Sequence, residues 1–277
     1  EWVITYDDDG VTELSRSAGA KALTVSGYSL SGDDAANYYI VQPEGLSATI
    51  SPETLTISGI TVETREYDGS TDATLDFSGL TLSGLVSGDQ ILVDGTGAFA
   101  SADAGTNKTV NITTTVSGTD VDNYTIMAPT TITGATIDKR TLNISGITAA
   151  DKEYDGGTSA TFDFSGVDLI AAGVVVDSSG VADLVSISSV SGNFSDANAG
   201  GNKAVSFTIT GTGADLANYS FGGQTTTTAT INPKLLTITG SSVADKTYDG
   251  STNAGAITIA TLTALVGGEQ LSVSASG

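Results

Sequence analysis

Apolar and polar residues alternate with a period of two over much of the chain. In residues 109–113 and 205–210, Val, Ile or Phe alternates with Thr, Ser or Asn. This alternation is typical of half-buried antiparallel strands with their apolar side chains facing inward. Tight-turn signals interrupt the strands as Asp-Gly pairs at 68–69, 94–95, 155–156 and 249–250. The pattern predicts an all-β chain built from two-sheet sandwiches of the immunoglobulin type.

The longest apolar run, residues 169–176, is interrupted by Gly173. It is far shorter than the roughly 18 residues of a membrane helix. We expect it to form a buried strand, and we expect no membrane insertion in this chain.

The strand pattern recurs as three similar segments, residues 55–69, 142–156 and 236–250, each ending in Tyr-Asp-Gly. Their tyrosines, Tyr67, Tyr154 and Tyr248, are 87 and 94 residues apart. This period is too long for a solenoid unit and suits one small β domain of about 100 residues.

Two further motifs keep the same order in each copy. Gly-x-Asp-x-x-Asn-Tyr ends at residues 38, 124 and 219, and Ala-Gly-x-Asn-Lys occupies 104–108 and 199–203, with a fainter form at 18–21. Residues 1–52 are therefore the C-terminal part of a repeat, 53–139 and 140–234 are complete repeats, and 235–277 are the N-terminal part of another. We interpret the chain as a piece of a longer array.

We assign structural roles to the conserved residues of these motifs. In Tyr-Asp-Gly, the glycine supplies a positive φ and the aspartate bonds nearby backbone amides. In the second motif, the tyrosine forms a corner that bonds to a neighbouring turn, which the Asp and Asn cap. Carbohydrate or calcium contacts are the functional alternatives. The signature residues are Tyr67, Asp68, Gly69, Tyr154, Asp155, Gly156, Tyr248, Asp249, Gly250, Asn37, Tyr38, Asn123, Tyr124, Asn218 and Tyr219.

Three lysines stand 16 or 17 residues before the tyrosines of the second motif: Lys21, Lys108 and Lys203. An isopeptide bond from such a lysine to the motif asparagine is one alternative, and a solvated Asp–Lys pair is the favoured interpretation. Calcium loops at residues 7–10 and at Asp120 and Asp122 give only a weak signal, because they lack the usual ligand pattern.

The composition narrows the classes of function. Ten Lys and Arg against 32 Asp and Glu give a net charge of −22, which disfavours nucleic acid and anionic membranes as partners. The acidity suits the solubility of a long secreted protein. The chain has neither Cys nor His, which removes disulfides, thiolate metal sites and the usual general base. We expect no enzyme activity and no cofactor.

The joints between copies are short. Pro52 and Pro233 stand at two of them, and Asp138-Lys139-Arg140 at the third. Proline restricts its own backbone and that of the preceding residue, so we expect a semi-rigid string of domains.

Lys-x-Tyr-Asp-Gly at 152–156 and 246–250, and Arg-Glu-Tyr-Asp-Gly at 65–69, resemble the YDG repeat. This repeat is related to the mostly bacterial immunoglobulin-like MBG domains. The resemblance implies an extracellular module repeated in large secreted adhesins of the filamentous-haemagglutinin-like, two-partner-secreted kind, some of which bind biofilm exopolysaccharide. Arg65 replaces the motif lysine in one copy, which argues against an obligatory chemistry there.

We therefore expect a structural stalk at the bacterial cell surface or outside the cell, in which neighbouring repeats are each other's partners. Extracellular polysaccharide or another cell surface would be bound by other parts of the parent protein. The alternative is a carbohydrate-binding array in which each repeat contributes to avidity.

Overall fold

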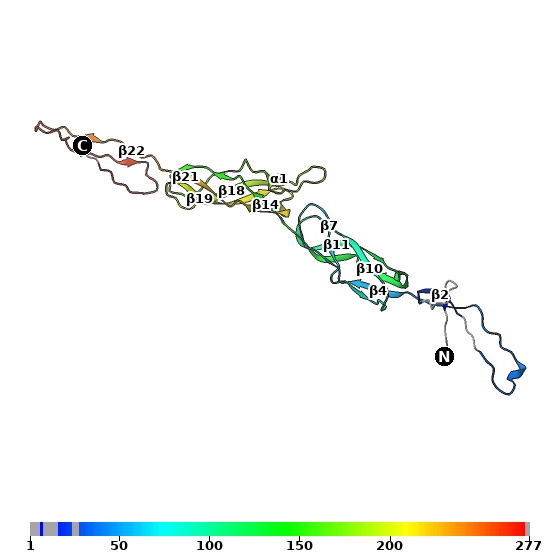
Figure 1. Ribbon diagram of the computed structural model, residues 1–277. Coiled ribbons are helices and arrows are strands. Elements are labelled where there is room, and N and C mark those ends of the chain that lie inside the picture. Colours follow the sequence, from blue (N-terminus) through cyan, green and yellow to red (C-terminus); the bar gives the residue numbers. More distant parts are fainter. Residues whose placement is uncertain (1–5, 8–15, 24–27, 275–277) are drawn as a thin grey trace. The chain divides into compact units, whose positions relative to one another are not determined.

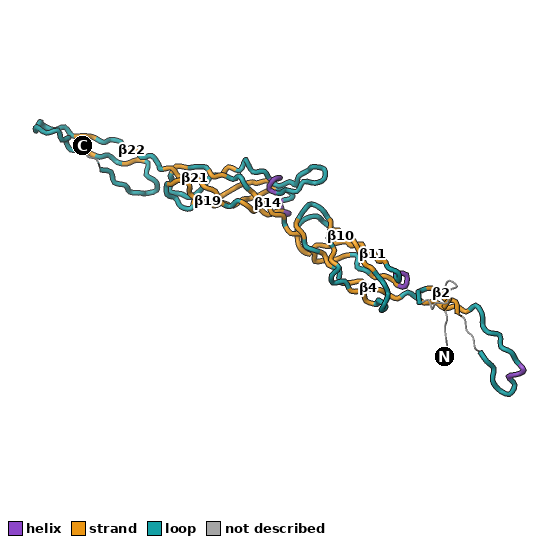
Figure 2. Tube along the Cα trace, in the orientation of Figure 1, coloured by secondary structure: helices purple, strands orange, loops and turns teal. Residues whose placement is uncertain are grey.

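The computed structural model describes residues 6–7, 16–23 and 28–274, and the chain is mostly β, with 45% strand and 5% helix. Figure 2 shows extended strands joined by loops, with very short helices. The chain divides into two compact units, residues 1–138 and 139–277.

The first unit begins with a three-stranded antiparallel sheet in the order β1-β2-β3. The strands are β1 (Tyr6–Asp7), β2 (Gly19–Leu23) and β3 (Leu46–Ile50), with a 3-10 helix at Ala35–Asn37 between the last two.

Residues 53–138 form a complete repeat with a five-stranded sheet, β6-β13-β11-β10-β7, and a three-stranded sheet, β12-β4-β9. Figure 1 labels β4, β7, β10 and β11 of this repeat. Its strands are β4 (Glu53–Ser58), β5 (Thr61–Val62), β6 (Arg65–Glu66), β7 (Asp72–Ala73), β8 (Leu75–Asp76), β9 (Thr81–Ser83), β10 (Leu92–Phe99), β11 (Gly105–Ser117), β12 (Tyr124–Met127) and β13 (Thr131–Asp138). A 3-10 helix, Val121–Asn123, precedes β12.

The second unit repeats this plan with a four-stranded sheet, β16-β21-β19-β18, and a two-stranded pair, β14-β20. Its elements are β14 (Arg140–Ile144), β15 (Thr148–Ala149), β16 (Lys152–Glu153), β17 (Phe162–Asp163), α1 (Leu169–Ala172), β18 (Ser186–Phe194), β19 (Gly200–Thr212), a 3-10 helix (Leu216–Asn218), β20 (Tyr219–Gly223) and β21 (Thr226–Asn232). The rest of this unit contains β22 (Thr237–Ile238), β23 (Ser242–Val243), β24 (Ile257–Thr258) and β25 (Leu262–Thr263).

The inward positions of the alternating strands form the cores. Leu55, Val110 and Ile137 are fully buried in the first complete repeat, and Leu142, Val205 and Ile231 occupy equivalent places in the second. The Thr and Ser residues between them face outward, as in Ser206, Thr208 and Thr210 of β19. Burial of these aliphatic side chains supplies the main driving force for folding.

The sheets are mixed, whereas the alternating pattern of the sequence predicts antiparallel strands throughout. β12 runs parallel to β4, and β13 runs parallel to β6. The second unit has the same parallel pairs in β14–β20 and β16–β21. The reason is that the first strands and the last strands of each repeat run in the same direction. We call the end of the repeat where these strands begin the leading end, and the end where they finish the trailing end.

The partner residues identify these two ends. In the first complete repeat, Tyr124 pairs with Glu53 at the leading end, and Asp138 pairs with Glu66 at the trailing end. The chain therefore starts a repeat at one end and finishes it at the other. The run from 124 to 138 spans roughly 40 Å at about 3.3 Å per strand residue.

A β-bulge explains the Ala-Gly-x-Asn-Lys motif. The register of β11 shifts between Gly105 and Lys108, and that of β19 shifts between Gly200 and Lys203. The motif asparagine takes a left-handed conformation there, with φ of 55° at Asn107 and 53° at Asn202, and Asn tolerates that conformation better than most residues.

The fainter copy of this motif is one residue shorter, and it lacks the bulge. Gly19, Ala20 and Lys21 of β2 pair with successive residues of β3 without a register shift. The missing residue is therefore the bulged one.

The predicted strand at 169–176 is wrong, because its first part forms the short helix α1. The carboxylate of Asp168 accepts hydrogen bonds of 3.0 Å from the amides of Ile170 and Ala171, and Gly173 ends the helix with φ of 117°. These are ordinary helix caps. Among the described residues, no helix is long and apolar enough to cross a membrane.

Candidate functional site

The Tyr-Asp-Gly motif forms the same turn in all three copies. Asp68, Asp155 and Asp249 each accept a hydrogen bond from the backbone amide two residues later, at 2.8, 2.9 and 2.9 Å. The glycines of the motif, Gly69, Gly156 and Gly250, have φ of 80°, 78° and 78°. A side chain is rarely tolerated at such φ values, which accounts for glycine at this position.

A basic residue three positions before the aspartate completes the turn. Lys152 forms an ion pair of 2.7 Å with Asp155, and Lys246 forms one of 2.9 Å with Asp249. Each lysine also donates to a backbone carbonyl just after the turn, at Gly157 (3.0 Å) and at Ser251 (3.1 Å).

Arg65 makes the same two kinds of contact, with Asp68 and with the carbonyl of Ser70. The replacement of Lys by Arg therefore preserves the turn chemistry. Arg65 also lies 5.3 Å from the ring centre of Phe99, as Lys152 lies 5.8 Å from that of Phe194, so the cation faces an aromatic ring in both complete repeats.

These contacts favour the charged carboxylates. The hydrogen bond from Lys152 and the amide of Gly157 lower the pKa of Asp155 below its usual value. The pKa of Asp249 is lowered in the same way by Lys246 and Ser251.

The motif turn is attached to the trailing end of its own repeat. The amide of Tyr67 donates to Asp138 (2.9 Å), and that of Tyr154 donates to Asn232 (2.8 Å). The three tyrosine side chains differ in exposure: Tyr67 is 5% exposed, Tyr154 is intermediate, and Tyr248 is 92% exposed.

The tyrosine of the second motif anchors a distant loop at the leading end. The hydroxyl of Tyr124 accepts from the amide of Val86 (2.9 Å) and donates to Asp89 (2.7 Å). The tyrosine thus bonds to a turn, as the sequence predicts, and this turn lies 35 to 38 residues upstream in the chain.

The second repeat builds the same contact. The hydroxyl of Tyr219 accepts from Val175 (2.9 Å) and donates to Asp183 (2.6 Å). Burial and the bond to Asp183 raise the pKa of Tyr219 well above its usual value.

The aspartate of the Gly-x-Asp-x-x-Asn-Tyr motif also bonds to this loop. Asp120 accepts from the amide of Gln90, and Asp215 accepts from the amide of Leu184, both at 2.8 Å. Each aspartate therefore bonds the loop that the motif tyrosine also bonds, which is the role expected for it. Neither side chain caps the 3-10 helix that follows it.

The motif glycine allows this loop to approach closely. A Cβ atom on Gly118 would lie 2.1 Å from the carbonyl oxygen of Gln90, and one on Gly213 would lie 1.9 Å from that of Leu184. Glycine at this position is therefore required by contact with the loop.

The three asparagines of the Gly-x-Asp-x-x-Asn-Tyr motif have different surroundings. Asn218 is buried at 3% exposure, and Asn123 accepts a hydrogen bond of 2.7 Å from the amide of Ala18. Asn37 is exposed and lies 3.5 Å from Asp34, beside Tyr38, which is 73% exposed.

The lysines of the third motif were candidates for an isopeptide bond. Lys203 instead forms an ion pair of 2.6 Å with Asp196. Lys21 is 2% exposed and donates to the hydroxyl of Ser17 at 3.0 Å.

Only one of the two calcium candidates lies wholly within the described residues. Asp8, Asp9 and Gly10 lie outside the described residues. Across the part of the chain that the structure describes, no three acidic side chains gather in a way that could hold a metal ion, and Asp120 is bonded to Gln90 and Thr119.

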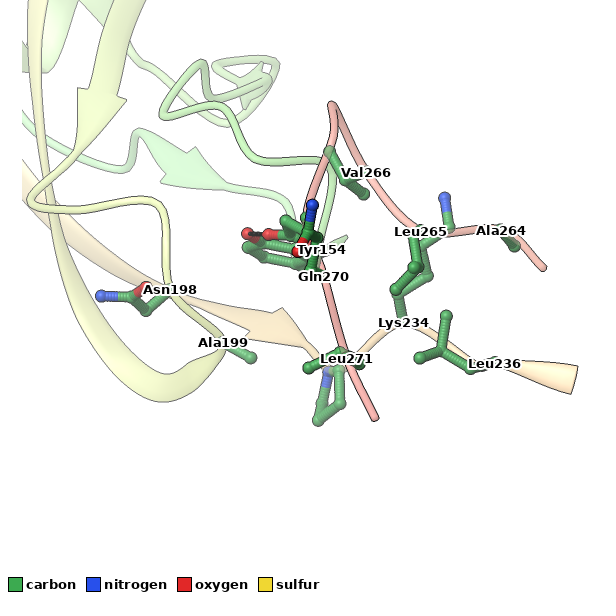
Figure 3. Close-up of a pocket in the computed structure, with 12 residues that line it drawn as sticks. Tyr154, Asn198, Ala199, Lys234, Leu236, Ala264, Leu265, Val266, Gln270 and Leu271 are labelled. Carbon is green, nitrogen blue, oxygen red and sulfur yellow. Dashed lines mark hydrogen bonds between the residues drawn. The ribbon is translucent and has the colours of Figure 1, made fainter. Parts of the chain in front are cut away.

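One candidate pocket of the second unit lies beside the Tyr-Asp-Gly turn and measures about 490 Å³. Asn198 and Ala199 lie on one side, Leu265 and Val266 on the other, and Tyr154 between them (Figure 3). Glu269, also in the wall, accepts a hydrogen bond from the hydroxyl of Tyr154.

A pocket of about 280 Å³ occupies the corresponding place in the first unit. Its wall contains Arg16 and Ala18 from the preceding partial repeat and Val86 and Asp89 from the complete repeat. Arg16 forms an ion pair of 2.8 Å with Asp89, whose side chain is only 6% exposed. Sequence reasoning missed both pockets, although the spacing of Val86 and Asp89 recurs in Val266 and Glu269.

Comparison with known families gives one match, described as the YDG domain, at residues 51–132 and 138–229. The two matched segments cover more than half of the chain and most of each complete repeat. Neither the curated proteins nor the solved structures give a match.

Proposed function

The chain belongs to the YDG domain family, and we propose that it is a structural spacer in a large bacterial adhesin. In this proposal, tandem immunoglobulin-like sandwiches form a rod that holds a distal binding region away from the cell surface. The protein is extracellular, it serves cell adhesion and biofilm formation, and two-partner secretion exports it.

One observation carries the proposal: each complete repeat starts at one end and finishes at the other. Tyr124 pairs with Glu53 at the leading end, and Asp138 pairs with Glu66 at the trailing end. A repeat of this kind adds its own length to an array, roughly 40 Å from strand geometry. The short joints at Pro52 and Pro233 support the same interpretation, because proline limits the backbone.

Small-angle scattering of the 277-residue chain tests the proposal. A compact domain of this length would have a radius of gyration of about 19 Å. The spacer requires a radius well above this value that changes little with salt concentration. A radius close to 19 Å would contradict it.

The alternative is an array in which each repeat binds carbohydrate. Exposed aromatic side chains favour it, because Tyr38, Tyr39 and Tyr248 are 73%, 87% and 92% exposed. Against it, the residues equivalent to Tyr38 in the complete repeats, Tyr124 and Tyr219, are buried at 8% and 3%. Saturable binding of the chain on a glycan array, lost when the exposed tyrosines are changed to alanine, would establish the alternative.

A further inference from the structure

We propose that the Tyr-Asp-Gly turn is one half of a docking joint, and that its partner is the leading loop of the following repeat. The leading loop is defined as residues 86–89 in the first complete repeat and 266–269 in the C-terminal partial repeat. This inference deepens the proposed spacer function. It rests on that function, because a docking joint is useful only if the repeats act as a spacer.

The first support is a pair of contacts within the second unit. The hydroxyl of Tyr154 donates to the carboxylate of Glu269. Gly156 of the same turn lies so close to this loop that a Cβ atom would be 2.9 Å from a methyl group of Val266. A polar and a steric contact therefore join one turn to one loop.

The second support is the copy of the turn that has no following repeat in this chain. Gly250 has the same φ as Gly156, 78°, but a Cβ atom on it would meet nothing within 4 Å. Tyr248 is 92% exposed, whereas Tyr154 is partly covered. The turn thus forms without a following repeat and without the later strands of its own repeat. Where a leading loop is present, Gly156 lies close to Val266 and Tyr154 bonds to Glu269.

The third support is an independent joint within the first unit. The leading loop there presents Asp89, which accepts an ion pair from Arg16 of the preceding partial repeat. Asp89 also binds the hydroxyl of Tyr124 in its own repeat. Its carboxylate therefore links the preceding copy to the internal anchor of the loop.

The two joints share one arrangement. Val86 and Asp89 have the spacing of Val266 and Glu269, and both pairs line a pocket against the trailing end of the preceding copy. Val266 approaches Gly156 of that end closely, Val86 lines the pocket beside it, and in both joints the acidic residue accepts a donor from the preceding copy. The donor differs, being a guanidinium in one joint and a phenol in the other, so a joint of this type accepts more than one donor.

Hydrogen exchange of the full 277-residue chain tests the joint at the amides of residues 264–271. Tyr154→Phe removes only the hydroxyl, and Tyr248→Phe is the matched control in the exposed copy. Because one hydrogen bond is lost, we expect exchange at 264–271 to become about 3- to 10-fold faster in Tyr154→Phe. The control should match the unaltered chain.

A second pair of variants tests the steric contact. Gly156→Ala and Gly250→Ala impose the same backbone strain, but only the first places a methyl group against Val266. We expect faster exchange at 264–271 in Gly156→Ala alone. Glu269→Ala removes the acceptor of the same hydrogen bond. Combined with Tyr154→Phe, it should not make exchange at 264–271 any faster than Tyr154→Phe alone, because both variants remove the same contact.

The proposal is overturned if the amides of residues 264–271 exchange at the unprotected rate in the unaltered chain. It is also overturned if the exchange rates of these amides are the same in Tyr154→Phe as in Tyr248→Phe and the same in Gly156→Ala as in Gly250→Ala. This result can be told apart from failure of the spacer function. A chain with undocked joints can still show a large radius of gyration, and a compact chain can still protect the loop.

Discussion

The hydroxyl of Tyr219 lies 2.6 Å from the carboxylate of Asp183, a residue 36 positions earlier in the chain. The same hydroxyl accepts a hydrogen bond from the amide of Val175. One side chain therefore bonds both sides of the loop between Val175 and Asp183, and Tyr124 does the same for residues 86–89 in the preceding repeat. This anchoring explains the tyrosine that recurs at the end of the motif in both complete repeats.

Removal of the hydroxyl should destabilise the second repeat. Tyr219→Phe removes the hydrogen bonds to the amide of Val175 and to the carboxylate of Asp183, which costs about 1–3 kcal/mol. We expect a lower melting temperature for this repeat, measured by calorimetry on the full chain. Tyr38→Phe is the control, because Tyr38 is 73% exposed. Equal effects of the two variants would refute the anchoring role.

The close contact at Gly213 predicts a large steric effect. In Gly213→Ala the new methyl group overlaps the carbonyl of Leu184, and the backbone at φ of 134° becomes strained. We expect a loss of about 3 kcal/mol in the free energy of unfolding of this repeat. Chemical denaturation followed by circular dichroism measures it.

Gly32 provides the matched control for this variant. It is the equivalent glycine of the N-terminal partial repeat, it also has a positive φ, 119°, and a Cβ atom on it would meet nothing within 4 Å. Gly32→Ala therefore reports backbone strain alone. If it were as harmful as Gly213→Ala, contact with the loop would not be the reason for glycine.

The ion pair in the turn predicts a pH dependence. The folded-state pKa of Asp155 is lowered chiefly by the hydrogen bond from Lys152. A carboxyl with a lowered pKa adds stability above its unfolded pKa of about 3.9, and this stability is lost as the pH falls through the folded value. Lys152→Met should therefore lower the melting temperature at pH 7 and have little effect near about pH 2.

Lys152→Arg is the control, because Arg65 occupies this position in the other complete repeat and makes the same contacts. It should keep the pH profile of the unaltered chain. A difference between Lys152→Met and the unaltered chain that stayed constant down to pH 2 would show that packing, and not charge, carries the effect.

The local features were predictable from the sequence because neighbouring residues determine them. The turn at Asp155 and Gly156 is one example, and the alternating strand around Val205 is another. The helix at 169–172 was missed although its caps, Asp168 and Gly173, are visible in the sequence. The apolar run between them outweighed those signals in the prediction.

The long-range features were not predictable, for two physical reasons. An alternation of apolar and polar residues shows which face of a strand is buried but not the direction of the neighbouring strand. The parallel pairing of β4 with β12 is therefore not visible in the sequence. The partner of Tyr219 lies in a loop without periodicity, and its distance along the sequence gives no hint of contact. The family resemblance supplied the β class but not these contacts.

The bulge at Asn202 gives the last prediction. This residue has φ of 53° where the register between β19 and β21 shifts. Alanine is strained in the left-handed region by about 1 kcal/mol, whereas glycine is not. We expect Asn202→Ala to lower the free energy of unfolding by about that amount and Asn202→Gly to leave it nearly unchanged, as measured by urea denaturation. If the glycine variant were the less stable of the two, the asparagine side chain, and not its backbone conformation, would be what the motif conserves.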